Sequence, residues 1–316
     1  MEKAPWLTVY GVGGIGGILA GPLIKTYGSG VALIARGARK DHLQNKGLTL
    51  ESEVFGNYTV QPETVVSTLA ELPPQNLVLV CVKNGDLPAI LPDLKEAVEE
   101  NTILVPVMNG VSAGDLLRGE LPKGTVCDSV IYVVSGAGED YHIRQIGSFT
   151  NLFIGSMTGE AAALEAAQQV SRVLGDAGID CKFSASAKEE IWKKYILNCA
   201  FNIVTSARDV TIGEIVENDA LRLDYHALLR EAWQVSCAEG AKLGEDDVEE
   251  LYQRLFSYAP DSTSSLARDF AQGRAGEKDI FSKEVARRAA EHGIAVPITE
   301  QYVKLLDETL ERHRGA

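Results

Sequence analysis

A glycine-rich turn between an apolar run and a helical segment is the feature that most constrains the fold of this chain. The pattern Gly-x-Gly-x-x-Gly follows the apolar run Leu7–Tyr10, and we expect a helix to start at about Gly14. In dinucleotide-binding folds these glycines permit a tight turn, close approach of a pyrophosphate and close packing of helix on strand. The helix N-terminus then offers free N–H groups to phosphates. We therefore expect cofactor contacts at Gly11, Val12, Gly13, Gly14, Ile15 and Gly16.

Short apolar runs alternate with helical patterns over the first half of the chain. The runs are rich in β-branched residues, as buried parallel strands are, namely Leu7–Tyr10, Val31–Ala35, Leu77–Val82 and Thr102–Val107. A helical pattern over residues 88–100 separates the last two runs. This alternation predicts a doubly wound parallel sheet. Pro22 lies inside the first expected helix and should kink it.

The pattern changes after Gly124. We expect an antiparallel hairpin of Thr125–Val134 and Tyr141–Ile146, and further strands at Asn151–Ile154 and Asp180–Phe183, with a helix over residues 160–175 before the last of these. After Ser184 only helices are expected, over residues 187–207, 218–243, 245–257, 261–274, 278–292 and 297–313. The predicted fold class is α/β: a Rossmann-type doubly wound sheet with an antiparallel extension (residues 1–184), followed by an all-helical C-terminal domain (residues 185–316).

Charge and composition limit the partners of this chain. Its 316 residues include 30 basic and 44 acidic ones, a net charge of −14, which argues against nucleic acid or a membrane surface as the main partner. No leader sequence or membrane-spanning run is evident, so we expect a cytoplasmic protein. The five cysteines and five histidines show no metal-ligand spacing. We expect no metal site, and we expect all the cysteines to be free core thiols: Cys81, Cys127, Cys181, Cys199 and Cys237.

The end of the second expected strand selects the cofactor. An NAD site has an acidic residue there, which accepts a hydrogen bond from the ribose 2′-hydroxyl. This chain instead has Ala35-Arg36-Gly37-Ala38-Arg39-Lys40, with three cations and no acid. Arg36 can bind a 2′-phosphate with its planar guanidinium, so we expect NADP(H). The alternative is a solvated basic loop without a ligand.

A polar stripe interrupts an otherwise apolar helix between Glu190 and Thr205. Lys194, Asn198 and Asn202 are spaced four residues apart, so they lie on one helix face within about 80° of each other. Burying these groups without partners is costly, so either a substrate or other protein groups must face them. Desolvation lowers the pKa of a lysine, which makes Lys194 a candidate general acid toward an alkoxide that forms on a reduced carbonyl.

With these residues in place, the chain resembles the ketopantoate reductases (2-dehydropantoate 2-reductases) over nearly its whole length. The resemblance rests on five motifs in order: Gly11–Gly16, Val82-Lys83, Asn109-Gly110, Glu190-x-Trp192-x-Lys194-x-x-x-Asn198-x-x-x-Asn202, and Ser264-Ser265-x-x-x-Asp269 with Glu277 after it. It implies an NADPH-dependent reductase that converts a 2-keto acid to pantoate for coenzyme A biosynthesis.

The resemblance also implies a role for each matching residue. Lys194 matches the catalytic lysine of the family, and Glu277 the glutamate that helps to hold the substrate hydroxyl. Asn109 matches an asparagine near the nicotinamide ribose and the substrate, and Lys83 a lysine that reaches into the cofactor cleft. The expected substrate-binding positions are Asn198, Asn202 and Ser265, together with Asn109. Read without the resemblance, the alternatives are a loop cation for Lys83, a turn for Asn109, helix packing for Ser265 and a cap or surface acid for Glu277.

Two departures from the family pattern lie on the expected substrate side. Ser282-Lys283 replaces an Asn-Gly pair, and Ile212 replaces an asparagine found in some members. Our hypothesis is an NADPH-dependent reductase with ketopantoate as the small-molecule substrate and Lys194 as the proton donor. The alternatives are a reductase of another branched 2-keto acid and a catalytically silent NADP-binding protein. The sequence leaves the oligomeric state open, a homodimer included.

Overall fold

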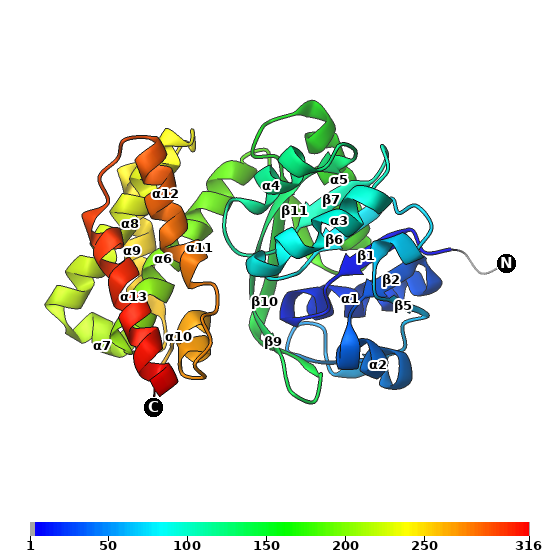
Figure 1. The fold of residues 1–316 in the computed structure, drawn as a ribbon, viewed down its shortest axis with the longest axis horizontal. Helices are drawn as coiled ribbons and strands as arrows, with labels where there is room; N and C mark the ends of the chain where they lie inside the picture. Colours follow the sequence, from blue (N-terminus) through cyan, green and yellow to red (C-terminus); the bar gives the residue numbers. More distant parts are fainter. Residues whose placement is uncertain (1–3, 316) are drawn as a thin grey trace. The chain divides into compact units, whose positions relative to one another are not determined.

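The computed structural model describes residues 4–315 and divides the chain into two compact units. The first unit ends at Lys188 and the second begins at Glu189, whereas the sequence analysis expects a boundary at residue 184. Within the described residues every strand lies in the first unit, and the second unit is helical (Figure 1). This is the predicted fold class, an α/β unit followed by a helical one.

Six parallel strands form the main sheet of the first unit, in the order β5-β2-β1-β6-β7-β8. Strands β1, β2 and β6 are buried along their whole length, which is why their sequences are almost entirely apolar. The strands are β1 (Leu7–Tyr10), β2 (Val31–Ile34), β5 (Thr64–Val66), β6 (Leu77–Val80), β7 (Ile103–Pro106) and β8 (Thr125–Val126). The doubly wound sheet predicted from the sequence is thus confirmed, and the strand order reverses between β1 and β6.

Helices cover both faces of this sheet (Figure 1). Residues of α3 (Leu87–Ala97) and α4 (Ala113–Glu120) share one core with Tyr10 of β1. Residues of α1 (Gly14–Tyr27) share the other core with Leu7 and Val9. Successive residues of a strand point to opposite faces, so one short strand contributes to both cores. The helix α1 continues through Pro22, which lies inside it and is buried.

The first unit contains a second sheet, which has both parallel and antiparallel strands. The helices α1 and α5 (Ala161–Asp176) pack against it. Its long strand β10 pairs antiparallel with β9, and its two halves pair parallel with β3 and β11. The strand β4 extends the sheet beside β3. The bounds are β3 (Leu48–Ser52), β4 (Tyr58–Val60), β9 (Asp128–Ala137), β10 (Ile143–Gly155) and β11 (Asp180–Phe183).

The predicted hairpin differs from the observed one in two ways. The run expected from Thr125 to Val134 is split, because β8 joins the parallel sheet beside β7 while β9 turns into the second sheet. The segment Asn151–Ile154, expected as a separate strand, is the second half of β10 after an irregularity that begins at Ile146. The antiparallel extension therefore belongs to a sheet of its own.

Several elements of the first unit were not predicted, and they share a polar, half-exposed character. The helix α2 (Gly37–Lys46) has one buried residue, Leu43, so it shows little apolar periodicity. Strands β3, β4 and β5 are three to five residues long, and their burial is partial. The short helix α4 was also missed.

The second unit is built around α6 (Ala187–Arg208), which carries the predicted polar stripe. Four segments expected as single helices are broken or shortened, namely residues 218–243, 245–257, 261–274 and 278–292. Asn218 caps the N-terminus of α8 (Asp219–Ala238), because its side-chain oxygen accepts hydrogen bonds from the N–H groups of Ala220 and Leu221. The remaining helices are α7 (Ile212–Glu217), α8 (Asp219–Ala238), α9 (Glu245–Gln253), α10 (Ser265–Phe270), α11 (Lys278–Phe281), α12 (Lys283–Glu291) and α13 (Pro297–Gly315).

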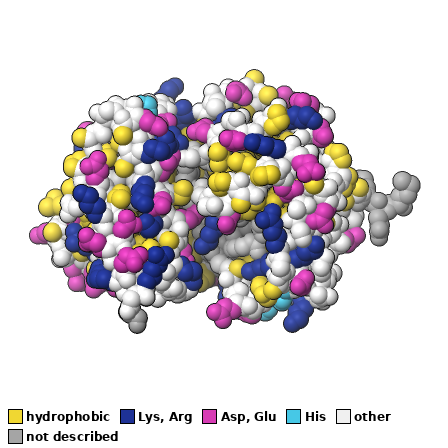
Figure 2. Space-filling model, in the orientation of Figure 1, with side chains coloured by type: hydrophobic (Ala, Val, Ile, Leu, Met, Phe, Trp, Pro, Cys, Tyr) yellow, Lys and Arg dark blue, Asp and Glu magenta, His cyan; other side chains and the backbone are white. Residues whose placement is uncertain are grey.

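Surface charge, helix hydropathy and cysteine burial can be compared with the expectations from composition. Acidic and basic side chains are interspersed on the face of both units drawn in Figure 2. Among residues 4–315, none of the helices is both long and apolar enough to cross a membrane. All five cysteines are free, but the expectation that all lie in the core was wrong, because Cys181 is half-buried and Cys237 is exposed.

Candidate active site

The glycine loop joins β1 to α1 at the point where the strand order of the sheet reverses. A Cβ at Gly16 would overlap the backbone oxygen of Gly11, so the fold itself requires a glycine at residue 16. Gly13 is different, because a Cβ there would meet no atom within 4 Å and its φ is −90°. The packing of the protein does not explain this glycine. Open space beside the backbone fits the close approach of a pyrophosphate.

The N-terminus of α1 is also suited to an anion. Gly13 occupies the capping position, and no side chain caps the helix there. The first N–H groups of an α-helix have no partner within the helix, and together with the helix dipole they attract negative charge. Gly14 packs on the second sheet, since a Cβ there would lie 2.9 Å from the oxygen of Ser135. The loop therefore fits a dinucleotide phosphate in shape and in charge.

Arg36 lies at the carboxyl end of β2, immediately before α2, and is exposed. Its Nη2 donates to the hydroxyl of Tyr10 at 3.2 Å, and its Nε donates to the carbonyl of Ser67 at 3.4 Å. Lys40 approaches the same residue, because its Nζ donates to the Ser67 hydroxyl at 2.9 Å. Two cations thus converge on Ser67, where a phosphate would find charge and donors.

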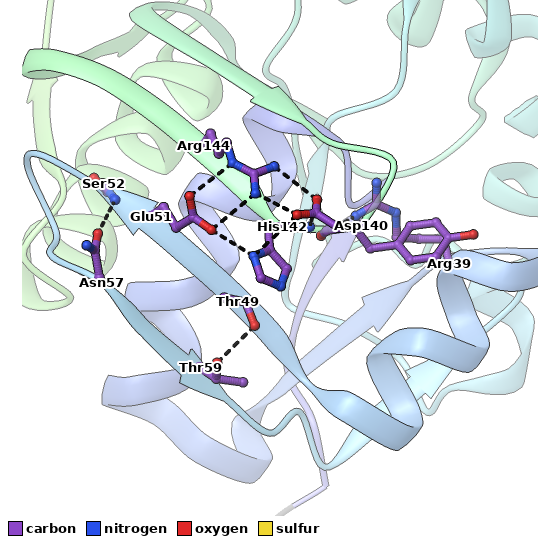
Figure 3. Close-up of polar contacts among 10 residues, drawn as sticks. Arg39, Thr49, Glu51, Ser52, Asn57, Thr59, Asp140, His142 and Arg144 are labelled. Carbon is purple, nitrogen blue, oxygen red and sulfur yellow. Dashed lines mark hydrogen bonds and ion pairs between the residues drawn. The ribbon is translucent and has the colours of Figure 1, made fainter.

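Arg39, the third cation of this segment, lies in α2 and contacts a different part of the first unit. It donates to the carbonyl of Tyr141 at 3.0 Å, and its guanidinium lies 4.8 Å from the centre of the Tyr141 ring. Tyr141 belongs to the turn between β9 and β10. A cluster of charged residues connects this turn to β3, as Figure 3 shows. In this cluster Glu51 contacts both His142 and Arg144. Of the three cations, Arg36 and Lys40 therefore remain as candidates to bind a phosphate.

Two further candidate residues follow neighbouring strands of the parallel sheet. Lys83 follows β6 and is exposed, and Asn109 follows β7 and is half-buried. Asn84 joins the two loops, because its amide donates to the backbone carbonyl of Asn109 at 2.7 Å. The sequence analysis did not single out Asn84, although it stands next to Lys83. Ligands of open α/β sheets bind at these carboxyl ends, so this pair lies where a cofactor is expected.

In the second unit, α6 presents Lys194 from a helix whose neighbouring side chains are buried. Ile191, Trp192 and Tyr195 are each exposed by 4% or less. Burial lowers the pKa of Lys194 from 10.5 to about 8, while the charge of Glu277 acts in the opposite direction. The ammonium is therefore a stronger acid than an ordinary lysine, and a carboxylate supports its charged form.

Contacts between α11 and α6 help to position Glu277. It occupies the position before α11, after Gly276, whose φ of +54° is unfavourable for other residues. The hydroxyl of Tyr195, which is adjacent to Lys194 in the sequence, donates to the carbonyl of Ile280 at 2.5 Å. This hydrogen bond holds α11 against α6. Tyr195 and Ile280 are 85 residues apart, so this contact could not be predicted from the sequence.

Asn202 is only 4% exposed and uses its side chain within the protein. Its amide donates to the carbonyl of Asn198 at 2.9 Å, and its oxygen accepts from the N–H of Leu266 at 3.3 Å and from the Ser265 hydroxyl at 3.4 Å. The sequence analysis expected Asn202 to bind substrate, whereas these contacts give it the internal partners that were the alternative. Asn198 is half-buried and Ser265 is exposed.

Ser264 fixes the start of α10 from inside the unit. Its hydroxyl oxygen accepts from the N–H of Ala267 at 3.0 Å and from the Thr205 hydroxyl at 2.8 Å. Both Ser264 and Thr205 are buried. Together with Asn202, these contacts attach α10 to α6, so Ser265 stands at a defined place beside the polar stripe.

The two departures from the family pattern point into the second unit. Ile212 is 1% exposed and begins α7. Ser282 is also 1% exposed, and its hydroxyl donates to the carbonyl of Lys278 at 2.7 Å. Both side chains thus serve the fold of the helical unit.

Comparison with known proteins gives a consistent result. A family model described as "Ketopantoate reductase PanE/ApbA" matches residues 7–159, and its C-terminal counterpart matches residues 186–310. A 2-dehydropantoate 2-reductase of Archaeoglobus fulgidus is 26% identical over 306 residues, which cover 94% of this chain and 95% of the relative. An "uncharacterized oxidoreductase YkpB" of Bacillus subtilis is 24% identical over 292 residues, covering 92% of this chain and 94% of the relative.

Solved structures of the same architecture cover nearly the whole chain. A PanE/ApbA family ketopantoate reductase from Ralstonia eutropha is 27% identical, with a TM-score of 0.86 and coverage of 98% of this chain and 99% of the other. A D-mandelate dehydrogenase, solved with NADH and anilino(oxo)acetate, is 18% identical, with a TM-score of 0.85 and coverage of 98% and 99%. At that identity the second comparison speaks for the fold alone.

Proposed function

Because the chain belongs to the ketopantoate reductase family and is an oxidoreductase of that family, we propose that it reduces 2-dehydropantoate to (R)-pantoate with NADPH. Pantoate formation would place it in pantothenate and coenzyme A biosynthesis. The observation that carries the proposal is Lys194, whose pKa is lowered to about 8 by burial and whose charged form Glu277 supports. An amine of this acidity is suited to protonate an oxygen that becomes anionic.

The first unit supplies the cofactor contacts in this proposal. The loop from Gly11 to Gly16 and the start of α1 bind the pyrophosphate, and Arg36 with Lys40 binds the 2′-phosphate. Lys83 and Asn109 follow β6 and β7, where the rest of a dinucleotide would extend. When bound, the reduced nicotinamide supplies the hydride for the keto carbon.

The second unit supplies the proton and the substrate contacts. Lys194 holds its proton at Nζ and gives it to the substrate oxygen as negative charge develops there. Glu277 keeps that amine cationic until transfer, because its own charge raises the pKa of Lys194. Asn198 and Ser265 orient the carboxylate and hydroxyl of the substrate. Asn202 holds Ser265 and the start of α10 in place, a positioning role that its buried contacts support.

The decisive experiment follows NADPH oxidation by the purified protein with ketopantoate and a panel of other branched 2-keto acids. We expect ketopantoate to be the best substrate. Faster turnover of another keto acid would transfer the same mechanism to a different substrate. Tight NADPH binding with no turnover of any keto acid would indicate a cofactor-binding protein without catalysis.

A further inference from the structure

We infer that Tyr10 and Asp93 are positioning residues that fix the guanidinium of Arg36 for the 2′-phosphate of NADPH. This inference rests on the proposed function, because it concerns how the proposed cofactor is chosen over NADH. The observation behind it is a chain of hydrogen bonds that runs from Asp93 through Tyr10 to Arg36.

Tyr10 is the middle of this chain. It is the last residue of β1 and is 2% exposed. Its hydroxyl donates to Asp93 Oδ2 at 2.7 Å and accepts from Arg36 Nη2 at 3.2 Å. A carboxylate can only accept, so the Tyr10 proton points to Asp93 and the oxygen lone pairs remain available for Arg36. The direction of each hydrogen bond in the chain is therefore set.

Asp93 also holds the segment next to Ser67, whose carbonyl is the second acceptor of Arg36. Its Oδ2 accepts from the N–H of Leu69 at 2.8 Å and its Oδ1 accepts from the N–H of Ala70 at 3.2 Å. These residues begin a short 3-10 helix, Leu69–Glu71, and Ser67 lies just before it with its carbonyl accepting from Arg36 Nε. Asp93 of α3 thus binds the Tyr10 hydroxyl and also the segment that follows Ser67.

This support matters because Arg36 is a long, exposed side chain. An unsupported arginine samples many rotamers and must lose that freedom when it binds a phosphate. Here Nε and one Nη are held by protein acceptors before any ligand arrives, which orients the remaining N–H groups of the planar guanidinium. NADH has no 2′-phosphate, so the benefit should reach NADPH only.

The test compares dissociation constants of NADPH and NADH, measured by calorimetry in the absence of a keto acid. For Tyr10→Phe, which removes only the hydroxyl, we expect the NADPH dissociation constant to rise by roughly threefold or more, with that of NADH nearly unchanged. Asp93→Asn should act in the same direction and serves if the Tyr10 variant does not fold.

The matched control is Tyr58→Phe in the same unit. The Tyr58 hydroxyl is also buried but has no hydrogen-bond partner among the described residues, so both dissociation constants should stay at the wild-type values. If both Tyr10→Phe and Asp93→Asn leave the NADPH-to-NADH ratio unchanged, or weaken both cofactors equally, the positioning role is wrong. A wild-type protein that binds NADH as tightly as NADPH would instead refute the proposed cofactor, and with it this inference.

Discussion

The charge of Glu277 raises the pKa of Lys194 and so opposes the burial that lowers it. Burial is the larger effect, and the pKa settles at about 8. Glu277 lies before α11, which the hydrogen bond from Tyr195 to Ile280 attaches to α6. The acidity of the proposed proton donor therefore depends on two helices being held together.

This balance predicts a pH dependence for keto acid reduction. Lys194 must carry its proton to act as an acid, so kcat/KM should be constant below an apparent pKa of about 8 and fall at higher pH. Above that value the loss should be about tenfold per pH unit. In Glu277→Gln the raising influence is gone, so the decline should begin at a lower pH. A pH–rate profile of both proteins checks this, and a decline that moves to higher pH in the variant would contradict it.

Substitution of the proposed acid should affect turnover rather than cofactor binding. In Lys194→Ala we expect kcat to fall by roughly a hundredfold or more, since acid catalysis contributes about that much, while the NADPH dissociation constant stays near wild type. Steady-state kinetics and calorimetry give the two numbers. Unchanged kcat would remove Lys194 from the mechanism.

The adjacent lysine provides the control for this experiment. Lys193 Nζ lies 2.6 Å from Asp247 Oδ1, and that hydrogen bond raises the pKa of Lys193. Lys193→Ala removes an ammonium from the same helix turn, yet we expect kcat to remain within about twofold of wild type, because the variant keeps Lys194. A comparable loss in both variants would indicate damage to α6 instead of a lost acid.

The glycine loop predicts opposite outcomes for two similar substitutions. Gly13→Ala adds a methyl group where the protein has open space, so thermal stability should be retained while the affinity for NADPH falls by roughly tenfold or more. Gly16→Ala forces a Cβ onto the backbone of Gly11 and should lower the free energy of unfolding by roughly 3 kcal/mol or more. Thermal unfolding and NADPH titration distinguish them. Normal NADPH affinity in Gly13→Ala would exclude a close phosphate at that residue.

Four strands of the parallel sheet could be predicted from the sequence because buried strands are almost entirely apolar. The runs that became β1, β2, β6 and β7 are of this kind. The helix α2 and the strands β3 to β5 are half-exposed and carry no such pattern, so they were missed. The split between β8 and β9 depends on which strand each half pairs with, and this is a tertiary choice.

The candidate site, like the fold, could be predicted from the sequence only in part. Lys194 could be predicted as a site residue because a charge on an otherwise apolar helix needs a polar partner or a ligand. Two of the three internal partners of Asn202, Ser265 and Leu266, lie more than sixty residues away, and Tyr141 lies 102 residues from Arg39. Local patterns carry no record of such pairs. The spacing therefore predicted the stripe, but only the fold shows that the side chain of Asn202 is engaged inside the unit.

Two neighbouring serines should separate stability from substrate binding. Ser264→Ala removes the hydroxyl that caps α10 and accepts from Thr205, so the free energy of unfolding should fall by about 1–2 kcal/mol. Ser265 is exposed, so Ser265→Ala should change stability by less than about 0.5 kcal/mol but raise the KM for the keto acid. Denaturant unfolding and steady-state kinetics measure both effects. Equal stability losses would mean that the two hydroxyls share one structural role.

Cofactor choice should depend on Arg36 and not on its neighbour Arg39. Arg36→Ala removes the exposed guanidinium that Tyr10 and Ser67 hold, so we expect NADPH to bind roughly tenfold to a hundredfold more weakly, with NADH little affected. Arg39→Ala removes an arginine that is engaged with Tyr141, so the preference for NADPH should persist. Calorimetric titration of both variants with both dinucleotides decides the matter. Equal losses of NADPH and NADH in Arg36→Ala would contradict recognition of a 2′-phosphate, because the two cofactors differ at that group alone.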